Sequence, residues 1–105
     1  MEAWINETVL ITKRHARHSF RADILDAWGH RCAYCGRPAT TLDHVHPKAL
    51  GGLTVPENLV ACCIHCNGSK GSQNVWEWWR AQPFWRIDRE LVFVDWLEDW
   101  DLLRA

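Results

Sequence analysis

Four cysteines form two closely spaced pairs that can bind one metal ion. Cys32 and Cys35 make one Cys-x-x-Cys pair, and Cys63 and Cys66 make a second. Two intervening residues allow a tight turn to direct two thiolates at one tetrahedral ion. Two redox pairs or buried free thiols are the alternatives, but redox pairs usually occur singly beside a βαβ pattern that this sequence lacks. We therefore predict a structural zinc site, closed by four thiolates.

The fifth cysteine, Cys62, competes with Cys63 for a place in the second pair. Pairing Cys62 with Cys66 would leave three intervening residues, so Cys63 better matches the spacing of the first pair. We predict that Cys62 is a small buried hydrophobic residue. A zinc site of this kind supplements a small core, because metal binding is worth roughly 10–16 kcal/mol in small zinc modules.

A second group of polar residues lies between the cysteine pairs and directly after the second pair. Residues 43–47 read DHVHP, and three further polar residues follow: Asn58, Asn67 and Lys70. A neutral imidazole accepts a proton near pH 7, and carboxylate and amide oxygens suit hard ions such as Mg²⁺ or Mn²⁺. Because side chains alternate along a strand, Asp43 and His44 should point to opposite faces. We therefore expect a bulge or bend near Asp43, which would let both reach one phosphate.

Four segments together resemble the HNH endonuclease family: CAYCG, LDHVHPKALGG, ENLVACCIHCN and SKG, which run from about Cys32 to Gly71. The resemblance implies the ββα-metal (His-Me finger) fold, framed by two cysteine knuckles. The expected fold class is α+β, a small zinc-bound ββα-metal domain with flanking N- and C-terminal helices. We expect one domain over residues 1–105, with its core at about 30–71 and a Trp-rich helical extension over 72–105.

The resemblance also implies a role for each matching residue. His44 would be the general base that activates water, and Asp43 and Asn67 would hold one divalent ion, Mg²⁺ or Mn²⁺. Asn58 would hold the hairpin loop and orient the base, and Lys70 would approach a phosphate as a point charge. Asn67 replaces the last histidine of the family name, a known variant that leaves the identity of the ion open. The implied reaction is hydrolysis of DNA phosphodiester bonds, leaving 5′-phosphate and 3′-hydroxyl ends.

Further side chains are candidates for contacts with the DNA backbone. His46 would share the face of His44, although it can equally be a loop histidine without function. Arg14 and Arg17 would form a basic face with Arg21 if their segment is helical, and a solvated helix end is the alternative. Three more basic residues are candidates: Arg31, Arg37 and Lys48. A non-catalytic zinc module that binds nucleic acid or protein is the rival function, but it would not need the polar group around residues 43–67.

Hydrophobic spacing predicts the elements that position these groups. A helix is expected over 19–28, with Ser19 as its N-cap and Gly29 at its end. A strand over about 40–45 ends before Pro47, and the hairpin leads into a short helix after Cys63. A helix in QNVWEWWRAQ ends before residue 83, and a last helix is capped by Asp88, although VFV at 92–94 could be a strand. The predicted order is helix, hairpin, helix, helix, helix.

Composition sets the broad class of the protein. The chain has 105 residues, a net charge of −1, five cysteines and eight tryptophans. No apolar run suggests a membrane span or a signal peptide, so we expect a cytoplasmic protein with no membrane partner. The expected oligomeric state is a monomer or a homodimer. Most tryptophans should be core, namely Trp76, Trp79, Trp85, Trp96 and Trp100, whereas Trp4 and Trp78 are expected to be partly exposed.

Overall fold

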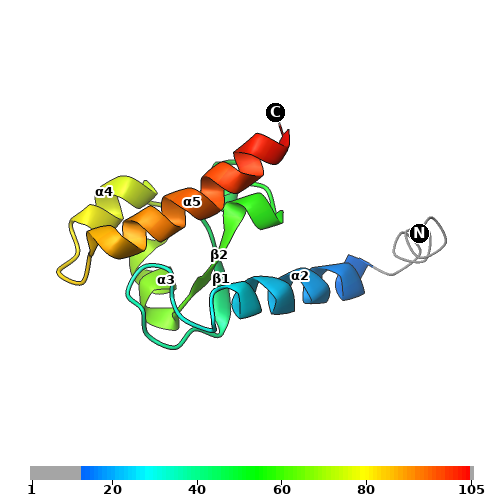
Figure 1. Ribbon diagram of the computed structural model, residues 1–105, viewed down its shortest axis with the longest axis horizontal. Helices are drawn as coiled ribbons and strands as arrows, with labels where there is room; N and C mark the ends of the chain where they lie inside the picture. Colours follow the sequence, from blue (N-terminus) through cyan, green and yellow to red (C-terminus); the bar gives the residue numbers. More distant parts are fainter. Residues whose placement is uncertain (1–12, 105) are drawn as a thin grey trace.

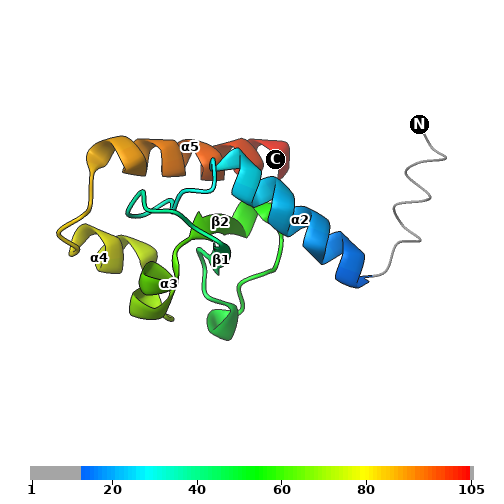
Figure 2. The ribbon, with the colours of Figure 1, turned by 90° about the horizontal axis from the view of Figure 1, so that it is seen from below.

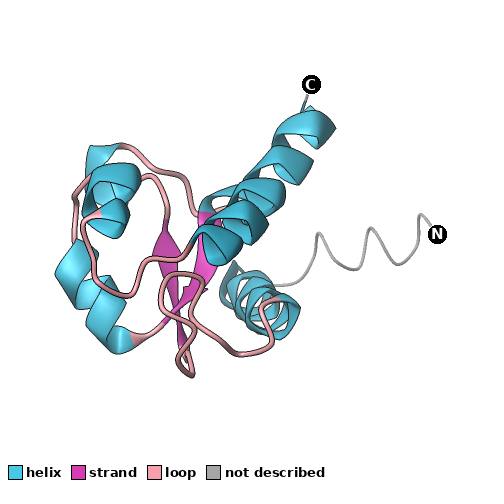
Figure 3. Ribbon diagram, turned by 60° about the vertical axis from the view of Figure 1, so that its left-hand side comes forward, coloured by secondary structure: helices cyan, strands magenta, loops and turns pink. Residues whose placement is uncertain are grey.

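The computed structural model describes the backbone of residues 13–104 and the side chains of residues 20–97. A two-stranded antiparallel hairpin lies at its centre, with helices around it (Figure 3). β1 (Thr41–His44) pairs with β2 (Leu59–Cys62) in continuous register, and all four residues of β2 are buried. The intervening loop contains two short turns of 3₁₀ helix, η1 (Lys48–Leu50) and η2 (Pro56–Asn58). The fold is α+β, as predicted.

The N-terminal helix, α2, packs against both strands (Figure 2). It spans Lys13–Ala27, so the prediction that it begins at Ser19 was wrong. The basic segment before Ser19 contains no glycine or proline, and the helix therefore continues through it. Gly29 follows the helix with a φ of +61°, a left-handed conformation that costs glycine little. The predicted C-terminal end is thus close to the observed one.

Three further helices follow the hairpin. α3 (Ile64–Lys70) begins directly after Cys63, and α4 (Val75–Arg80) is capped by the side-chain oxygen of Asn74. α5 (Ile87–Arg104) extends along one side of the molecule (Figure 1). Residues 92–94 (VFV) are helical. Asp88 lies inside the first turn of α5 rather than at its N-cap, and its carboxylate pairs with Arg86. Over residues 13–104, no helix is both long and apolar enough to cross a bilayer.

Aromatic side chains of α4 and α5 meet in one core. Trp79 from α4 and Phe93 from α5 are completely buried, and their ring centroids lie 5.0 Å apart. Three of the other predicted core tryptophans pack against this core: Trp76, Trp85 and Trp96. Trp78 is only 3% exposed, so the prediction of partial exposure was wrong. Its position completes the buried face of α4, and its indole N–H donates to the hydroxyl of Ser69. Trp4 and the side chain of Trp100 lie outside the described residues.

Gly52 is required by a close backbone approach in the loop after β1. Its N–H donates to the carbonyl of Pro47 over 2.9 Å, and a Cβ at this position would overlap the carbonyl oxygen of His46. We expect Gly52→Ala to destabilise the metal-loaded protein by about 1–3 kcal/mol, because the loop backbone must move to relieve the overlap. Thermal unfolding with excess zinc measures the effect.

Gly68 provides a matched control within α3. A Cβ there meets no atom within 4 Å, and alanine favours a helix over glycine by roughly 0.5–1 kcal/mol. Gly68→Ala should therefore leave the midpoint of unfolding unchanged or raise it. An equal loss of stability in both variants would show that the close approach at Gly52 carries no special cost.

Candidate active site

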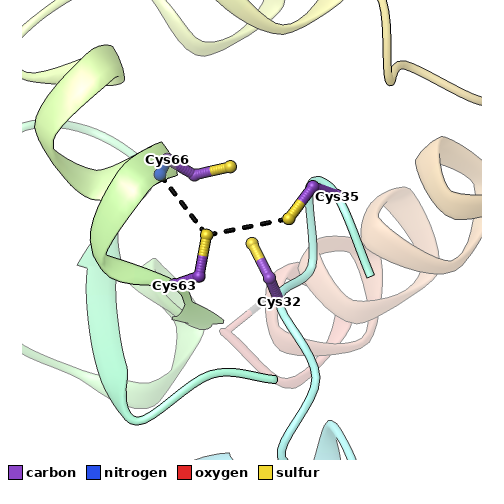
Figure 4. Close-up of side chains that lie close together, drawn as sticks. All are labelled: Cys32, Cys35, Cys63 and Cys66. Atoms are coloured by element: carbon purple, nitrogen blue, oxygen red, sulfur yellow. Dashed lines mark hydrogen bonds between the residues drawn. The ribbon is translucent and has the colours of Figure 1, made fainter. Parts of the chain in front are cut away.

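Four cysteine thiols converge from two segments of the chain (Figure 4). Cys32 and Cys35 come from the turn after α2, whereas Cys63 and Cys66 come from the start of α3. All four sulfur atoms lie within 4.8 Å of one another, and Cys35 Sγ lies 3.7 Å from Cys63 Sγ. Zn–S bonds of ~2.3 Å in a tetrahedron place sulfur atoms about 3.8 Å apart. The four cysteines could therefore hold a metal ion such as zinc.

The local backbone assists this cluster. Cys63 is the N-cap of α3, and its sulfur accepts a hydrogen bond from the backbone N–H of Cys66 over 3.4 Å. Burial raises the pKa of the Cys35 thiol, so a thiolate at that position needs a nearby cation. Cys62 is fully buried, and its thiol donates to the carbonyl of Cys63. The cluster of four thus contains Cys63 and not Cys62.

A polar cleft of about 290 Å³ opens where β1 ends beside α3. Asp43, His44 and Asn67 all line it, together with the exposed side chain of Lys48. The strand register contains no bulge, since Asp43 pairs with Val60 and His44 with the next residue of β2. The chain instead bends immediately after the strand, at residues 45–46. Both side chains border the cleft because it lies at the end of the strand.

Asp43 is 5% exposed and receives two donors on a single oxygen. Its Oδ2 accepts a hydrogen bond of 2.7 Å from the Tyr34 hydroxyl and lies 3.1 Å from Lys70 Nζ. Burial raises the pKa of Asp43, while the hydrogen bond from Tyr34 and the charge of Lys70 act in the opposite direction. Because both partners contact Oδ2, the other oxygen, Oδ1, is the one that can coordinate an ion.

Asn67 is oriented by the backbone of β1. Its Nδ2 donates to the carbonyl of Leu42 over 3.3 Å. A carbonyl can only accept, so this contact fixes which end of the amide is nitrogen. The amide oxygen is left as an acceptor in the cleft that Asn67 lines. One carboxylate oxygen and one amide oxygen are thus available for a hard divalent ion.

His44 is half-buried at the end of β1, and its Nε2 lies 2.9 Å from Thr54 Oγ1. When Nε2 carries the ring proton and donates to Thr54, Nδ1 is the nitrogen that can accept a proton. Burial lowers the pKa of His44, which favours the neutral imidazole that a general base requires. Thr54 and Tyr34 are contacts that the sequence analysis did not anticipate.

Lys70 is buried, whereas a residue that contacts a phosphate of the substrate must be accessible. Its side chain is completely buried, and Nζ donates to the carbonyl of His44 over 3.0 Å besides pairing with Asp43. The expectation that Lys70 approaches a phosphate is therefore corrected, because the buried ammonium group is used in contacts with β1. Both of these contacts hold the end of the strand that carries Asp43 and His44. Lys48 is the lysine that lines the cleft.

Asn58 and His46 belong to the loop that borders this site. Asn58 bonds the backbone of His46 through both ends of its amide and also donates to the carbonyl of Leu53. The imidazole of His46 contacts the carbonyl of Leu50 over 3.0 Å, and the residue does not line the cleft. The side chains of Arg14 and Arg17 lie outside the described residues, although their backbone is helical.

Comparisons with known proteins found one matching family and two similar proteins. Residues 32–73 match the model of the HNH endonuclease family. Over 47 residues the chain is 51% identical to the CRISPR-associated endonuclease Cas9 of Corynebacterium diphtheriae. This alignment covers 40% of the chain and 4% of that protein. The structure also resembles the Type II-C Cas9 enzyme from Actinomyces naeslundii, with a TM-score of 0.57 and 32% sequence identity. That match covers 67% of this chain and 8% of the other.

The chain therefore spans less than a tenth of the length of these two relatives. The family match nevertheless covers both cysteine pairs, the hairpin and the residues that line the cleft. The two-stranded hairpin followed by α3 is the ββα arrangement that the family resemblance implies. Residues 32–73 therefore match the HNH endonuclease family in sequence and in the arrangement of their elements.

Proposed function

We propose that the chain is a metal-dependent endonuclease that hydrolyses DNA phosphodiester bonds. The observation that carries the proposal is the meeting of Asp43, His44 and Asn67 at one cleft. A general base beside two oxygen ligands is the set of groups that metal-assisted attack of water on a phosphate requires. The two relatives are named as Cas9 enzymes, one of them as an endonuclease, which supports a nuclease activity.

In the proposed reaction, His44 accepts a proton from water at Nδ1. The water oxygen attacks phosphorus, the P–O3′ bond breaks, and the departing O3′ takes up a proton. Asp43 and Asn67 would hold Mg²⁺ or Mn²⁺, and the bound ion would supply positive charge to the phosphate and to the departing oxygen. Lys48 is positioned to contact a neighbouring phosphate from the rim of the cleft. With one such cleft, a monomer would cut one strand at a time.

We also propose that the four-cysteine site holds zinc that takes no direct part in the reaction. Four thiolates close the coordination shell and leave no position for water or substrate. The protein would then use two metals, a tightly held soft-ligand ion for folding and a weakly held hard-ligand ion for catalysis. This difference in affinity allows the two sites to be separated by experiment.

The ion dependence of cleavage tests the proposed function. Dialysis against buffer freed of divalent ions should remove the weakly bound hard ion and leave the zinc in place. We expect supercoiled plasmid to remain intact in that buffer and to be nicked when Mg²⁺ or Mn²⁺ is added. Asn67→Ala removes one oxygen ligand from the proposed ion site, so it should need a higher concentration of Mg²⁺ or Mn²⁺ for the same nicking.

Two outcomes would contradict the proposal. Cleavage of equal rate with and without added ions would exclude Asp43 and Asn67 as ligands of a catalytic ion. Tight DNA binding by the wild-type protein without cleavage under any ion condition would favour a non-catalytic zinc module. Gel electrophoresis of the plasmid, together with a DNA binding measurement on the same preparation, distinguishes these results.

A further inference from the structure

Tyr34 connects the cysteine cluster to the candidate ion site. It lies between Cys32 and Cys35 in the first knuckle, and its side chain is completely buried. From that turn its hydroxyl donates to Asp43 Oδ2 over 2.7 Å. A hydroxyl bonded to a carboxylate at this distance belongs to the stronger class of hydrogen bonds. One side chain thus extends from the four-cysteine site to a proposed ligand of the catalytic ion.

The ring of Tyr34 is clamped on several sides. Trp78 and Trp79 meet it edge-on, with centroids 5.1 and 5.0 Å away, and Phe93 lies at 5.6 Å. The indole N–H of Trp79 also donates to the backbone carbonyl of Tyr34 over 3.1 Å. Close packing of this kind leaves little freedom for the ring to turn or shift. The place of the hydroxyl is therefore set by the knuckle and by helices α4 and α5.

We propose that Tyr34 is a positioning residue that couples the four-cysteine site to the catalytic ion site. This inference rests on the proposed function of Asp43 as an ion ligand. By holding Oδ2, Tyr34 leaves Oδ1 as the oxygen directed to the ion. Partners of ligating carboxylates commonly matter almost as much as the ligands themselves. The knuckle thereby contributes to ion binding through a contact separate from its contribution to folding.

Tyr34→Phe tests this coupling, because it removes one oxygen and keeps the ring that packs in the core. With zinc saturating the cysteines, Mn²⁺ affinity is measured from the spectrum of free Mn²⁺ by electron paramagnetic resonance. We expect Tyr34→Phe to bind Mn²⁺ about 10-fold more weakly, the lower end of the ~10–100-fold range for such partners. Zinc content should stay at the wild-type value, which shows that the knuckle remains closed.

Thr41→Val is the matched control. Like Tyr34→Phe, it removes one hydroxyl, in this case from β1, where Thr41 Oγ1 donates to the carbonyl of Cys62. It leaves the contacts of Asp43 intact. We expect its Mn²⁺ affinity to equal that of the wild type. An equal loss in both variants would overturn the inference, because a general loosening of the hairpin would then explain both results.

The measurement separates this inference from the proposed cleavage reaction. Weaker Mn²⁺ binding by Tyr34→Phe supports the coupling even if the wild type cuts no DNA, since no turnover enters the measurement. Unchanged affinity in Tyr34→Phe, or no Mn²⁺ binding by the wild type at millimolar concentration, would overturn it. In an active protein, the Mn²⁺ concentration for half-maximal cleavage should rise with little change in the rate at saturation.

Discussion

Cys63→Ser is expected to release the metal and unfold the protein. Cys63 supplies one of the four clustered sulfurs, so its loss removes a metal ligand, whereas the serine oxygen can still cap α3. Metal binding by such sites is worth roughly 10–16 kcal/mol, whereas a whole domain is typically stable by about 5–15 kcal/mol. The core cannot compensate for a loss of that size. Zinc analysis of the purified variant and its far-ultraviolet circular dichroism give the result.

Cys62→Ala is the control, because Cys62 is the neighbouring cysteine and lies outside the cluster. It removes a small buried side chain, which costs about 1 kcal/mol and should leave one metal ion bound per chain. Loss of metal from Cys62→Ala with retention in Cys63→Ser would contradict the assignment of the ligands. Less than about one tightly held zinc per folded wild-type chain would contradict the zinc site itself.

His44→Ala is expected to lower the cleavage rate by about 10²–10⁴-fold, the usual contribution of a general base. The fold should survive, because the imidazole is half-buried and its side-chain hydrogen bond is to the exposed Thr54. Single-turnover cleavage of a duplex oligonucleotide at saturating Mg²⁺ measures the chemical step. Binding of Mn²⁺ should persist, since Asp43 and Asn67 remain in place.

His65→Ala is the matched control for that experiment. It also removes one imidazole, but His65 is exposed on the first turn of α3 and does not line the cleft of His44. We expect its cleavage rate to match that of the wild type. Equal cleavage rates for the wild type and His44→Ala would show that His44 is not the general base.

The spacing of the cysteines predicted that the two pairs meet, and the family resemblance implied that Asp43 and His44 lie near Asn67. Cys-x-x-Cys pairs specify tight turns, and a hairpin between them brings Asp43 and His44 toward the helix that carries Asn67. The same local signals predicted the hairpin and the short helix after Cys63. These features depend on neighbours in sequence, where turn and helix preferences are strong.

The features that sequence reasoning missed depend on packing between distant segments. Tyr34 reaches Asp43 only because α4 and α5 close over the first knuckle, and Thr54 reaches His44 across a folded loop. The burial of Lys70 likewise follows from the position of β1 above the end of α3. No periodicity in the sequence encodes such contacts. From residue type alone, a lysine and a threonine are expected at the surface and a tyrosine in an intermediate position.

An ion bound by both cysteine pairs would also close a ring of backbone around the hairpin. Cys35 and Cys63 are 28 positions apart, so an ion that joins them closes a ring of backbone with the hairpin inside it. Within that ring the loop between the strands is already held at both ends by strand pairing. Lengthening such a loop is entropically cheap, at about 0.6 kcal/mol for each doubling. An insertion in the loop beside His44 would therefore cost little in closure entropy as long as it keeps the contacts of Thr54 with His44 and of Asn58 with His46.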